Sequence, residues 1–249
     1  MKGNSCSFTH NGQRSQNEDY YIADDFLGIY VLADGMGGYK GGEVACRIAA
    51  TTCHHYIKNH LDTLIDMDEL MNTIRHKLNE EIQDHPEYVS MGTTLCCLYI
   101  QDGNIHAIHI GDSKIILVAD QIYESRDHTY VQQLIDLHLL SADEYQHHPM
   151  QHILTRCLTG NVKEKFNADY CKIPLKEGRN TLFLCSDGVM EAISVAEVIL
   201  WLKSESDIHK TLYTIEQQAL RSSEDNSTAI LVNINYPFTG TDSNNKPVI

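Results

Sequence analysis

Carboxylates recur in this sequence at the ends of apolar segments. The most informative case is Asp34-Gly35-Met36-Gly37-Gly38, which follows the apolar run at 29–33. Glycine lets backbone and ligand approach closely, so the pattern is typical of an ordinary turn or of a site that holds a carboxylate beside a ligand. Carboxylates stand at comparable positions in four other segments, which are Glu18-Asp19, Gly111-Asp112-Ser113, Ser186-Asp187-Gly188 and Glu224-Asp225-Asn226.

If the fold brings these carboxylates together, they form a site that requires cations. Like charges at close range raise one another's pKa, so without cations the cluster would become protonated. A ligand set made only of oxygen atoms favours hard divalent ions. The sequence therefore predicts Mg²⁺ or Mn²⁺.

Composition and charge exclude several other classes of protein. The chain has 249 residues, of which 42% are hydrophobic, so it can bury a sizeable core. Its formal net charge of −15 argues against non-specific binding to nucleic acid or to an anionic membrane surface. No segment reaches the roughly 18 apolar residues of a membrane span, and the N-terminus lacks the apolar stretch of a signal peptide. We expect neither nucleic acid nor membrane among its partners.

The eight cysteines indicate a reducing compartment. None forms a Cys-x-x-Cys pair, and Cys46, Cys96 and Cys185 lie in apolar segments, where a free thiol packs as a small hydrophobic group. This pattern argues against a disulfide scaffold or a zinc site, and we expect a cytoplasmic protein.

Residue patterns predict eight strands and six helices. The strands are expected at 5–10, 20–24, 28–33, 93–100, 105–110, 114–119, 182–186 and 229–234. The helices are expected at 42–59, 67–84, 128–139, 195–204 and 207–221, and a capping box at 141–144 would open a further short one. Hairpin spacing and paired helices favour antiparallel sheets with helices outside them, in one domain over 1–235. Residues 236–249 are polar and aperiodic, and we expect a flexible tail.

Other polar residues are interpreted as structural. Asp127 is expected to cap the helix at 128–139, and Thr93-Thr94 is ordinary strand composition. The fourteen histidines are expected at surface or packing positions. His106 and His109, three residues apart, would point to opposite faces of a strand.

Taken in order, the motifs resemble those of the metal-dependent protein phosphatases, the PPM or type 2C serine/threonine phosphatase family, in its short bacterial form. The matches run from about residue 7 to residue 234. They are Arg14-Ser15-Gln16-Asn17-Glu18-Asp19, the glycine motif at 33–38, Gly42-Glu43-Val44-Ala45, Met91-Gly92-Thr93-Thr94, Gly111-Asp112-Ser113, Arg126-Asp127-His128, His148-Pro149, Leu154-Thr155-Arg156, Ser186-Asp187-Gly188 and Asp225-Asn226-Ser227-Thr228. The resemblance implies an α+β fold, a four-layer α-β-β-α sandwich in which two antiparallel sheets of five or six strands are flanked by helix pairs.

The resemblance also implies a centre for two Mn²⁺ or Mg²⁺ ions. Asp34 would bridge both ions, and the Gly35 carbonyl would bind the second. Asp187 and Asp225 would hold the first ion. Glu18 would lie near the second.

The implied reaction is hydrolysis of phosphoserine and phosphothreonine by direct attack of a metal-bridging hydroxide, without a covalent intermediate. Asp19 would orient the water, and Arg14 would bind the phosphoryl oxygens as a planar fork. Asp112, again with Asp187, would offer a weaker third metal site. The implied partners are a phosphoprotein substrate and a cognate serine/threonine kinase; the sequence does not indicate an oligomeric state.

Two residues depart from patterns found in the family. Met36 stands where some members carry a histidine proposed as general acid, and methionine cannot donate a proton. Protonation of the leaving group would then fall to metal-bound water or another group. Glu191 stands four residues after Asp187, where an aspartate often assists the third ion. Two alternatives stay open: a non-catalytic pseudophosphatase that acts as a regulatory module, and a binuclear metallohydrolase that acts on small phosphate esters.

Overall fold

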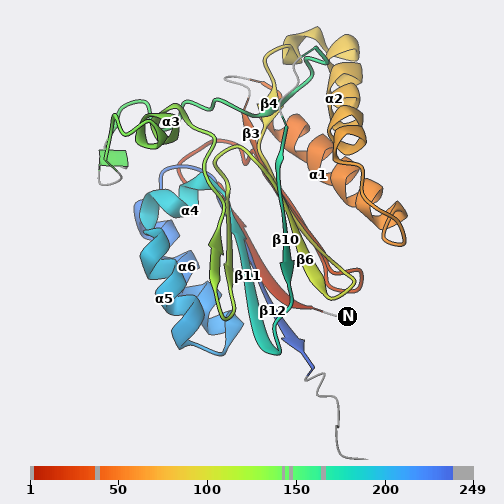
Figure 1. The fold of residues 1–249 in the computed structure, drawn as a ribbon. Helices are drawn as coiled ribbons and strands as arrows, with labels where there is room; N and C mark the ends of the chain where they lie inside the picture. The colour runs from red at the N-terminus through yellow and green to blue at the C-terminus, as the bar shows by residue number, and fades with distance from the viewer. Residues whose placement is uncertain (1–2, 37–39, 142–143, 146–147, 164–166, 238–249) are drawn as a thin grey trace, which may run out of the picture.

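Two antiparallel β-sheets lie face to face between two layers of helices (Figure 1). The computed structural model describes residues 3–36, 40–141, 144–145, 148–163 and 167–237. Gly37 and Gly38 of the glycine motif lie outside these residues. So does the predicted tail beyond Pro237, together with part of the predicted short helix at 141–144.

The first sheet has five strands in the order β1-β12-β11-β7-β8. Their bounds are β1 (Asn4–His10), β7 (Lys114–Val118), β8 (Ile122–Glu124), β11 (Gly178–Cys185) and β12 (Ser227–Tyr236). The N-terminal strand pairs with the last strand, in a register that puts His10 opposite Ser227. This pairing brings the loop after β1 beside the segment before β12, although the two are more than 200 residues apart in the chain.

The second sheet has seven strands, ordered β10-β6-β5-β3-β4-β9 with β2 on the other side of β3. Their bounds are β2 (Asp19–Asp24), β3 (Ile29–Met36), β4 (Gly92–Thr93), β5 (Leu95–Gln101), β6 (Asn104–Ile110), β9 (Leu158–Thr159) and β10 (Asp169–Pro174). The sheet has more than the expected five or six strands because β4 and β9, which have two residues each, extend it at one end.

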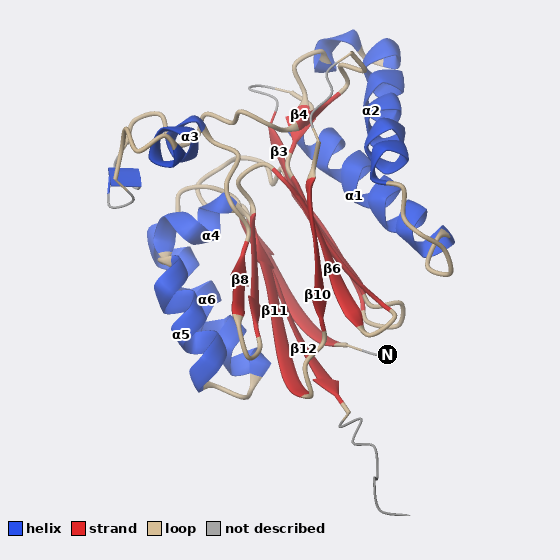
Figure 2. Cartoon of the chain, in the orientation of Figure 1, coloured by secondary structure: helices blue, strands red, loops and turns tan. Residues whose placement is uncertain are grey.

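Helices cover the outer face of each sheet (Figure 2). The second sheet is covered by α1 (Gly42–Asn59) and α2 (Met67–Asp84), and the first by α4 (Asp187–Ala192), α5 (Val195–Ser204) and α6 (Ile208–Ser222). A 3₁₀ turn (Pro86–Tyr88) follows α2, and α3 (Tyr130–Asp136) lies apart from both helix layers. The predicted four-layer α-β-β-α sandwich is confirmed.

The apolar run before Asp34 is unbroken because both faces of β3 are covered. Ile29 and Val31 pack in the cluster beneath α1 and α2. Tyr30 and Leu32 pack in the cluster between the sheets. Since side chains alternate along a strand, Asp34 continues the row that faces the space between the sheets. The carboxylate therefore stands at the end of the central core, where apolar burial gives way to polar groups.

Several predicted boundaries were wrong. The strand expected at 28–33 continues to Met36, so Asp34 lies inside the strand and not after it. The strand expected at 93–100 is interrupted at Thr94. The helix expected at 128–139 is shorter, and its cap is Thr129, whose hydroxyl accepts from Gln132 N at 3.1 Å. Asp127 does not cap this helix and instead binds Lys114.

Candidate metal centre

Four aspartates converge where the two sheets meet at one end of the sandwich. The pairing of β2 with β3 sets Asp19 opposite Asp34. Asp187 opens α4 directly after β11, and Asp112 lies in the turn between β6 and β7. Burial raises the pKa of Asp34 well above its ordinary value, and the charges of Asp19, Asp187 and Asp112 raise it further. These four carboxylates therefore lie close to one another, and the roles predicted for them stay predictions.

Asp19 is the most enclosed part of this cluster. The Ser186 hydroxyl donates to its Oδ2 at 2.7 Å, but its Oδ1 has no hydrogen-bond partner among the described residues. Burial raises the pKa of Asp19 to about 7, although the nearby hydroxyls of Thr228 and Ser186 lower it. Burying a carboxylate oxygen without a hydrogen-bond donor costs free energy of folding. The carboxylate oxygens of this cluster are suitable ligands for a hard divalent ion, or for the water that such an ion holds.

Asp112 and Asp187 share an open cavity of about 1000 Å³ with Glu191. Burial raises the pKa of Asp112 well above its ordinary value, and Asp187 adds to the effect. Burial also raises the pKa of Glu191, whose Oε2 accepts from the Ser223 hydroxyl at 3.3 Å. The longer side chain of Glu191 thus reaches the same cavity as the predicted third-site residues.

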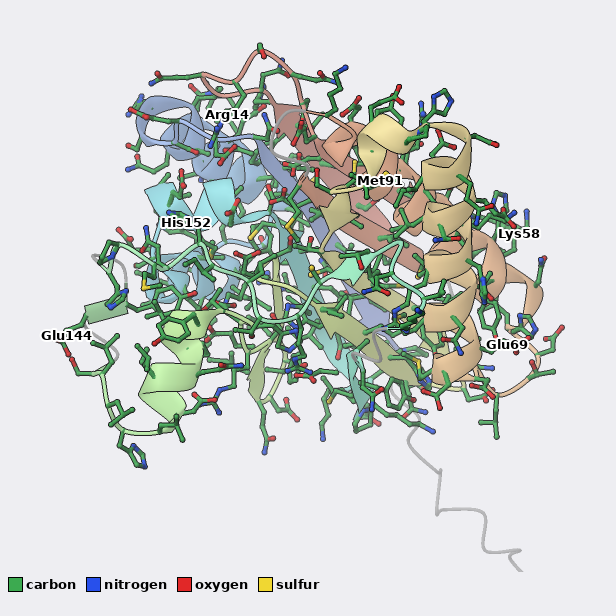
Figure 3. The ribbon with its side chains drawn as sticks, turned by 90° about the horizontal axis from the view of Figure 1, so that it is seen from above. Arg14, Lys58, Glu69, Met91, Glu144 and His152 are labelled. Carbon is green, nitrogen blue, oxygen red and sulfur yellow. The ribbon has the colours of Figure 1, made fainter. Side chains whose placement is uncertain are left out.

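Arg14 lies at the edge of the cluster and is paired with Asp225. Its Nε donates to Asp225 Oδ1 at 3.0 Å and its Nη2 to Oδ2 at 2.7 Å. This hydrogen bond raises the pKa of the guanidinium. The Arg14 side chain is 62% exposed, so its remaining donors face solvent. In the view from above, Arg14 and His152 lie over the half of the molecule that contains α4 and α6, whereas Lys58 and Glu69 lie at the opposite edge (Figure 3).

Glu18 and Gly35 lie where β3 meets the start of α1. Gly35 N donates to the Glu18 carbonyl at 2.9 Å. A Cβ at position 35 would stand 2.0 Å from the Gly42 carbonyl oxygen, so only glycine allows this close packing. Burial raises the pKa of the Glu18 carboxyl, and the charge of Glu43 adds to the effect.

Several supporting residues escaped the sequence interpretation. Thr94, interpreted as ordinary strand composition, accepts from Asp34 N at 3.0 Å through its hydroxyl, and its own N donates to the Asp34 carbonyl at 2.9 Å. Asn226 Oδ1 accepts from Glu18 N at 2.8 Å. Thr94 belongs to the Met91-Gly92-Thr93-Thr94 motif and Asn226 follows Asp225, but neither position indicated these hydrogen bonds. His152, whose Nδ1 lies 3.9 Å from Asp187 Oδ2, gave no signal.

Comparison of the whole chain with known proteins decides the family. The model for the family described as protein phosphatase 2C matches residues 7–223. The chain belongs to the protein phosphatase 2C family. The predicted resemblance is confirmed.

Two relatives show how far the likeness extends. The chain is 30% identical over 234 residues to the protein phosphatase PhpP of Streptococcus pneumoniae, covering 90% of this chain and 94% of PhpP. It is 29% identical over 230 residues to the serine/threonine protein phosphatase PstP of Mycobacterium tuberculosis, covering 89% of this chain. The chain spans only 43% of the length of PstP.

Solved structures agree with the fold. The M. tuberculosis PstP structure superposes with a TM-score of 0.82 at 25% identity, covering 95% of this chain and 100% of that one. A structure of the PstP catalytic domain in complex with two manganese ions superposes with a TM-score of 0.80 at 24% identity, covering 93% and 98%. Among the described residues of this protein, no helix has the length and apolarity to cross a membrane.

Proposed function

We propose that this chain is a metal-dependent serine/threonine protein phosphatase that hydrolyses phosphoserine and phosphothreonine. The observation that supports it most is the convergence of Asp19, Asp34, Asp112 and Asp187 beside the Arg14–Asp225 pair. Membership of the protein phosphatase 2C family supports the same activity.

We propose that the cluster holds two Mn²⁺ or Mg²⁺ ions. Asp34 would bridge them, Asp187 and Asp225 would complete the first site, and the Gly35 carbonyl and Glu18 would serve the second. The raised pKa values of Asp34 and Glu18 support this assignment, because bound cations would let both carboxyls ionise. Bound ions supply Lewis acidity and a water activated for direct attack on phosphorus.

The remaining residues would act on water and substrate. Asp19, one of whose carboxylate oxygens has no hydrogen-bond donor in the part of the chain that the structure describes, would orient the attacking water. The exposed guanidinium of Arg14 would bind two phosphoryl oxygens and hold phosphorus in line for attack. Asp112 with Asp187 would form a weaker third metal site, assisted by Glu191. Met36 cannot protonate the leaving alkoxide, and we assign that step to water in the open cavity.

The wider setting follows from the same proposal. Residues 1–235 would form one catalytic domain, and the substrate would be a phosphoprotein modified by a cognate serine/threonine kinase. All eight cysteines are free thiols, which supports a reducing, cytoplasmic location.

The direct test is hydrolysis of a phosphothreonine peptide by the purified protein with Mn²⁺. We expect turnover that EDTA abolishes and that Mn²⁺ restores. Absence of turnover would favour the pseudophosphatase alternative. Faster turnover of small phosphate esters than of phosphopeptides would favour the generic metallohydrolase.

A further inference from the structure

Two buried histidines hold the turn that carries Asp112. His109 Nε2 donates to the Ser113 carbonyl at 2.8 Å. The backbone N of His128 donates to the Gly111 carbonyl at 2.8 Å, and its Nδ1 accepts from Gly111 N at 3.0 Å. The two imidazoles thus bind Gly111 N–H and the Ser113 carbonyl, one residue before and one residue after Asp112, and their ring centroids lie 4.8 Å apart.

The hydrogen bonds of His128 fix its tautomer. Because Nδ1 accepts the Gly111 N–H, the proton of the neutral ring is on Nε2. Nε2 therefore donates to Asp169 Oδ2, at 3.0 Å. Asp169 Oδ1 accepts in turn from Arg156 Nη1 at 2.8 Å. The turn is thereby connected to residues at the start of β10 and in the segment that follows α3.

This tautomer argues against a metal ion at the histidines. One ligand atom each from His109, His128 and Asp169 lies within 4.8 Å of the others, and His109 Nδ1 has no partner among the described residues. However, a metal on His128 Nε2 would displace the proton to Nδ1, where it would meet the Gly111 N–H. The Arg156 guanidinium on Asp169 also repels a cation.

Burial favours the neutral form of both rings. Burial lowers the pKa of His109 to about 3, and burial also lowers the pKa of His128. Gly111 has a φ of 108°, and a Cβ there would stand 2.5 Å from Thr94 Cγ2. The Thr94 hydroxyl lies 2.7 Å from that of Ser113 and also accepts from Asp34 N. Thr94 therefore joins the Asp112 turn to the strand that carries Asp34.

We propose that His109 and His128 are positioning residues that hold the Gly111-Asp112-Ser113 turn so that the Asp112 carboxylate faces Asp187. The inference rests on the proposed function in one respect, the role of Asp112 as a ligand of the third metal site. The hydrogen bonds that hold the turn are observed independently of that role.

Asparagine and glutamine at the two positions give a crossed test. The asparagine side-chain oxygen can replace Nδ1, and the glutamine side-chain nitrogen can replace Nε2. At position 128 the atom facing the turn is Nδ1, so His128→Asn retains the contact and His128→Gln loses it. At position 109 it is Nε2, so His109→Gln retains the contact and His109→Asn loses it. His106→Gln is the matched control, because His106 is buried on the same strand but binds the Tyr170 hydroxyl.

Two measurements report on the turn and on the metal. Amide exchange of Gly111 and of its neighbours, followed by NMR on the EDTA-treated protein, reports how firmly the turn is held. A calorimetric Mn²⁺ isotherm reports the weakest site. In His128→Gln and His109→Asn we expect exchange in the turn to accelerate roughly three- to tenfold, as loss of one hydrogen bond implies. The Mn²⁺ concentration that half-fills the weakest site should rise by a similar factor, whereas the two retaining variants and His106→Gln should stay within about twofold of wild type.

The outcomes separate this inference from the proposed function. Equal effects of asparagine and glutamine at each position would overturn the inference, since general destabilisation does not produce a crossed pattern. Faster exchange with an unchanged isotherm would also overturn it, provided Asp112→Asn does alter the isotherm. If Asp112→Asn leaves the isotherm unchanged, the metal role proposed for Asp112 is wrong, and the positioning role is overturned with it. Because each position has its own pair of variants, one variant that fails to fold leaves the other position to decide.

Discussion

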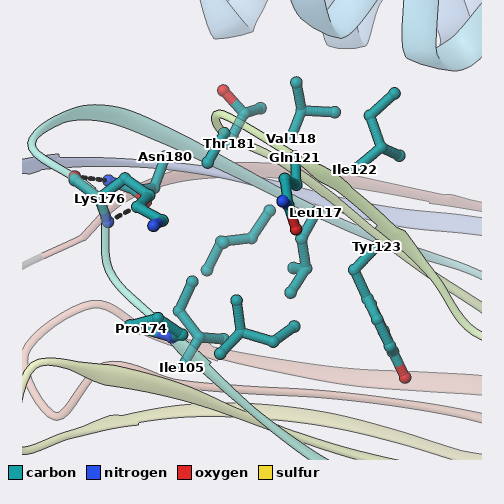
Figure 4. Close-up of a pocket in the computed structure, with 13 residues that line it drawn as sticks. Ile105, Leu117, Val118, Gln121, Ile122, Tyr123, Pro174, Lys176, Asn180 and Thr181 are labelled. Atoms are coloured by element: carbon teal, nitrogen blue, oxygen red, sulfur yellow. Dashed lines mark hydrogen bonds between the residues drawn. The ribbon is translucent and has the colours of Figure 1, made fainter.

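The two ends of the β-sandwich contrast sharply, although the same strands build both. β6, β7 and β11 each run between the carboxylate cluster and an apolar pocket of about 280 Å³ at the other end (Figure 4). Strand geometry separates the two ends by about 15–20 Å. The pocket is lined by Ile105, Leu117, Val118, Ala119, Gln121, Ile122, Tyr123, Ile173, Pro174, Lys176, Asn180, Thr181 and Leu182.

The two ends differ in the amount of charge that they withdraw from solvent. At the apolar end, Asn180 satisfies the local backbone, accepting from Lys176 N at 2.9 Å and donating to the Lys176 carbonyl at 2.7 Å. At the other end, Asp19 is buried and Asp34 and Asp112 are partly buried beside like charges, and the pKa values of all three are raised. One end of the strands therefore stabilises the fold, while the other holds groups that disfavour it without cations. Both ends of the sandwich have a pocket, so the presence of a pocket does not identify the candidate metal centre. The convergence of carboxylates at one end does.

The largest expected effect is on catalysis at the carboxylate end. Asp34→Asn should lower kcat for a phosphothreonine peptide by at least about 10³-fold, because it removes the charge proposed to bridge both ions. The EDTA-treated variant should be at least as stable as wild type, since the amide avoids burying an anion. Steady-state kinetics and thermal unfolding with and without Mn²⁺ check both points. Retained activity, or a stabilisation by Mn²⁺ as large as in wild type, would contradict the assignment.

Arg14 should have the next largest effect on activity. Arg14→Ala should lower kcat/KM by about 10²-fold, because the phosphoryl group loses a bidentate, charge-assisted contact. Arg14→Lys is the control: it keeps the charge without the planar fork and should recover only part of the loss. Phosphopeptide kinetics at saturating Mn²⁺ check this. Equal activity of the lysine variant and wild type would exclude a role for the fork.

Shortening a buried side chain at the apolar end should lower the stability of the fold and leave catalysis almost unchanged. Leu182 is fully buried, and Leu182→Ala should reduce the free energy of unfolding by about 2–4 kcal/mol through lost contacts and a new cavity. We expect kcat at saturating Mn²⁺ to change by less than about twofold. Urea denaturation paired with kinetics measures both quantities. A large loss of kcat in a folded variant would show that the two ends are coupled and would break the contrast.

The smallest expected effect concerns the pH dependence of stability. The folded-state pKa of Asp19 is raised to about 7, so between about pH 4 and 7 the folded protein holds a proton that the unfolded chain releases. This group therefore destabilises the metal-free protein increasingly as pH rises through that window. His109, with its pKa lowered to about 3, contributes the opposite slope.

The comparison with Asp19→Asn isolates the carboxyl. In EDTA, the variant should gain stability relative to wild type as pH rises from about 4 to 7, and this difference should shrink when Mn²⁺ is added. Denaturant unfolding at several pH values measures it. A difference that does not vary with pH would show that Asp19 ionises as an ordinary surface carboxyl.

The sequence alone predicted antiparallel sheets with helices outside them, and it identified acidic residues that the fold brings together. The helices at 42–59, 67–84 and 195–204 have the predicted bounds, because amphipathic spacing and caps are local signals. Asp34, Asp112 and Asp187 were visible because each stands beside glycine and close to an apolar segment.

Tertiary structure decided what depends on partners distant in the chain. The strands β8, β9 and β10 were missed because they are short or exposed and form only by pairing with an existing edge. The pairing of β1 with β12 brings Arg14 to Asp225, 211 residues away. The roles of His109 and His128 were equally invisible, because the peptide groups they bind acquire their positions only when the turn, the strands and the flanking segment assemble.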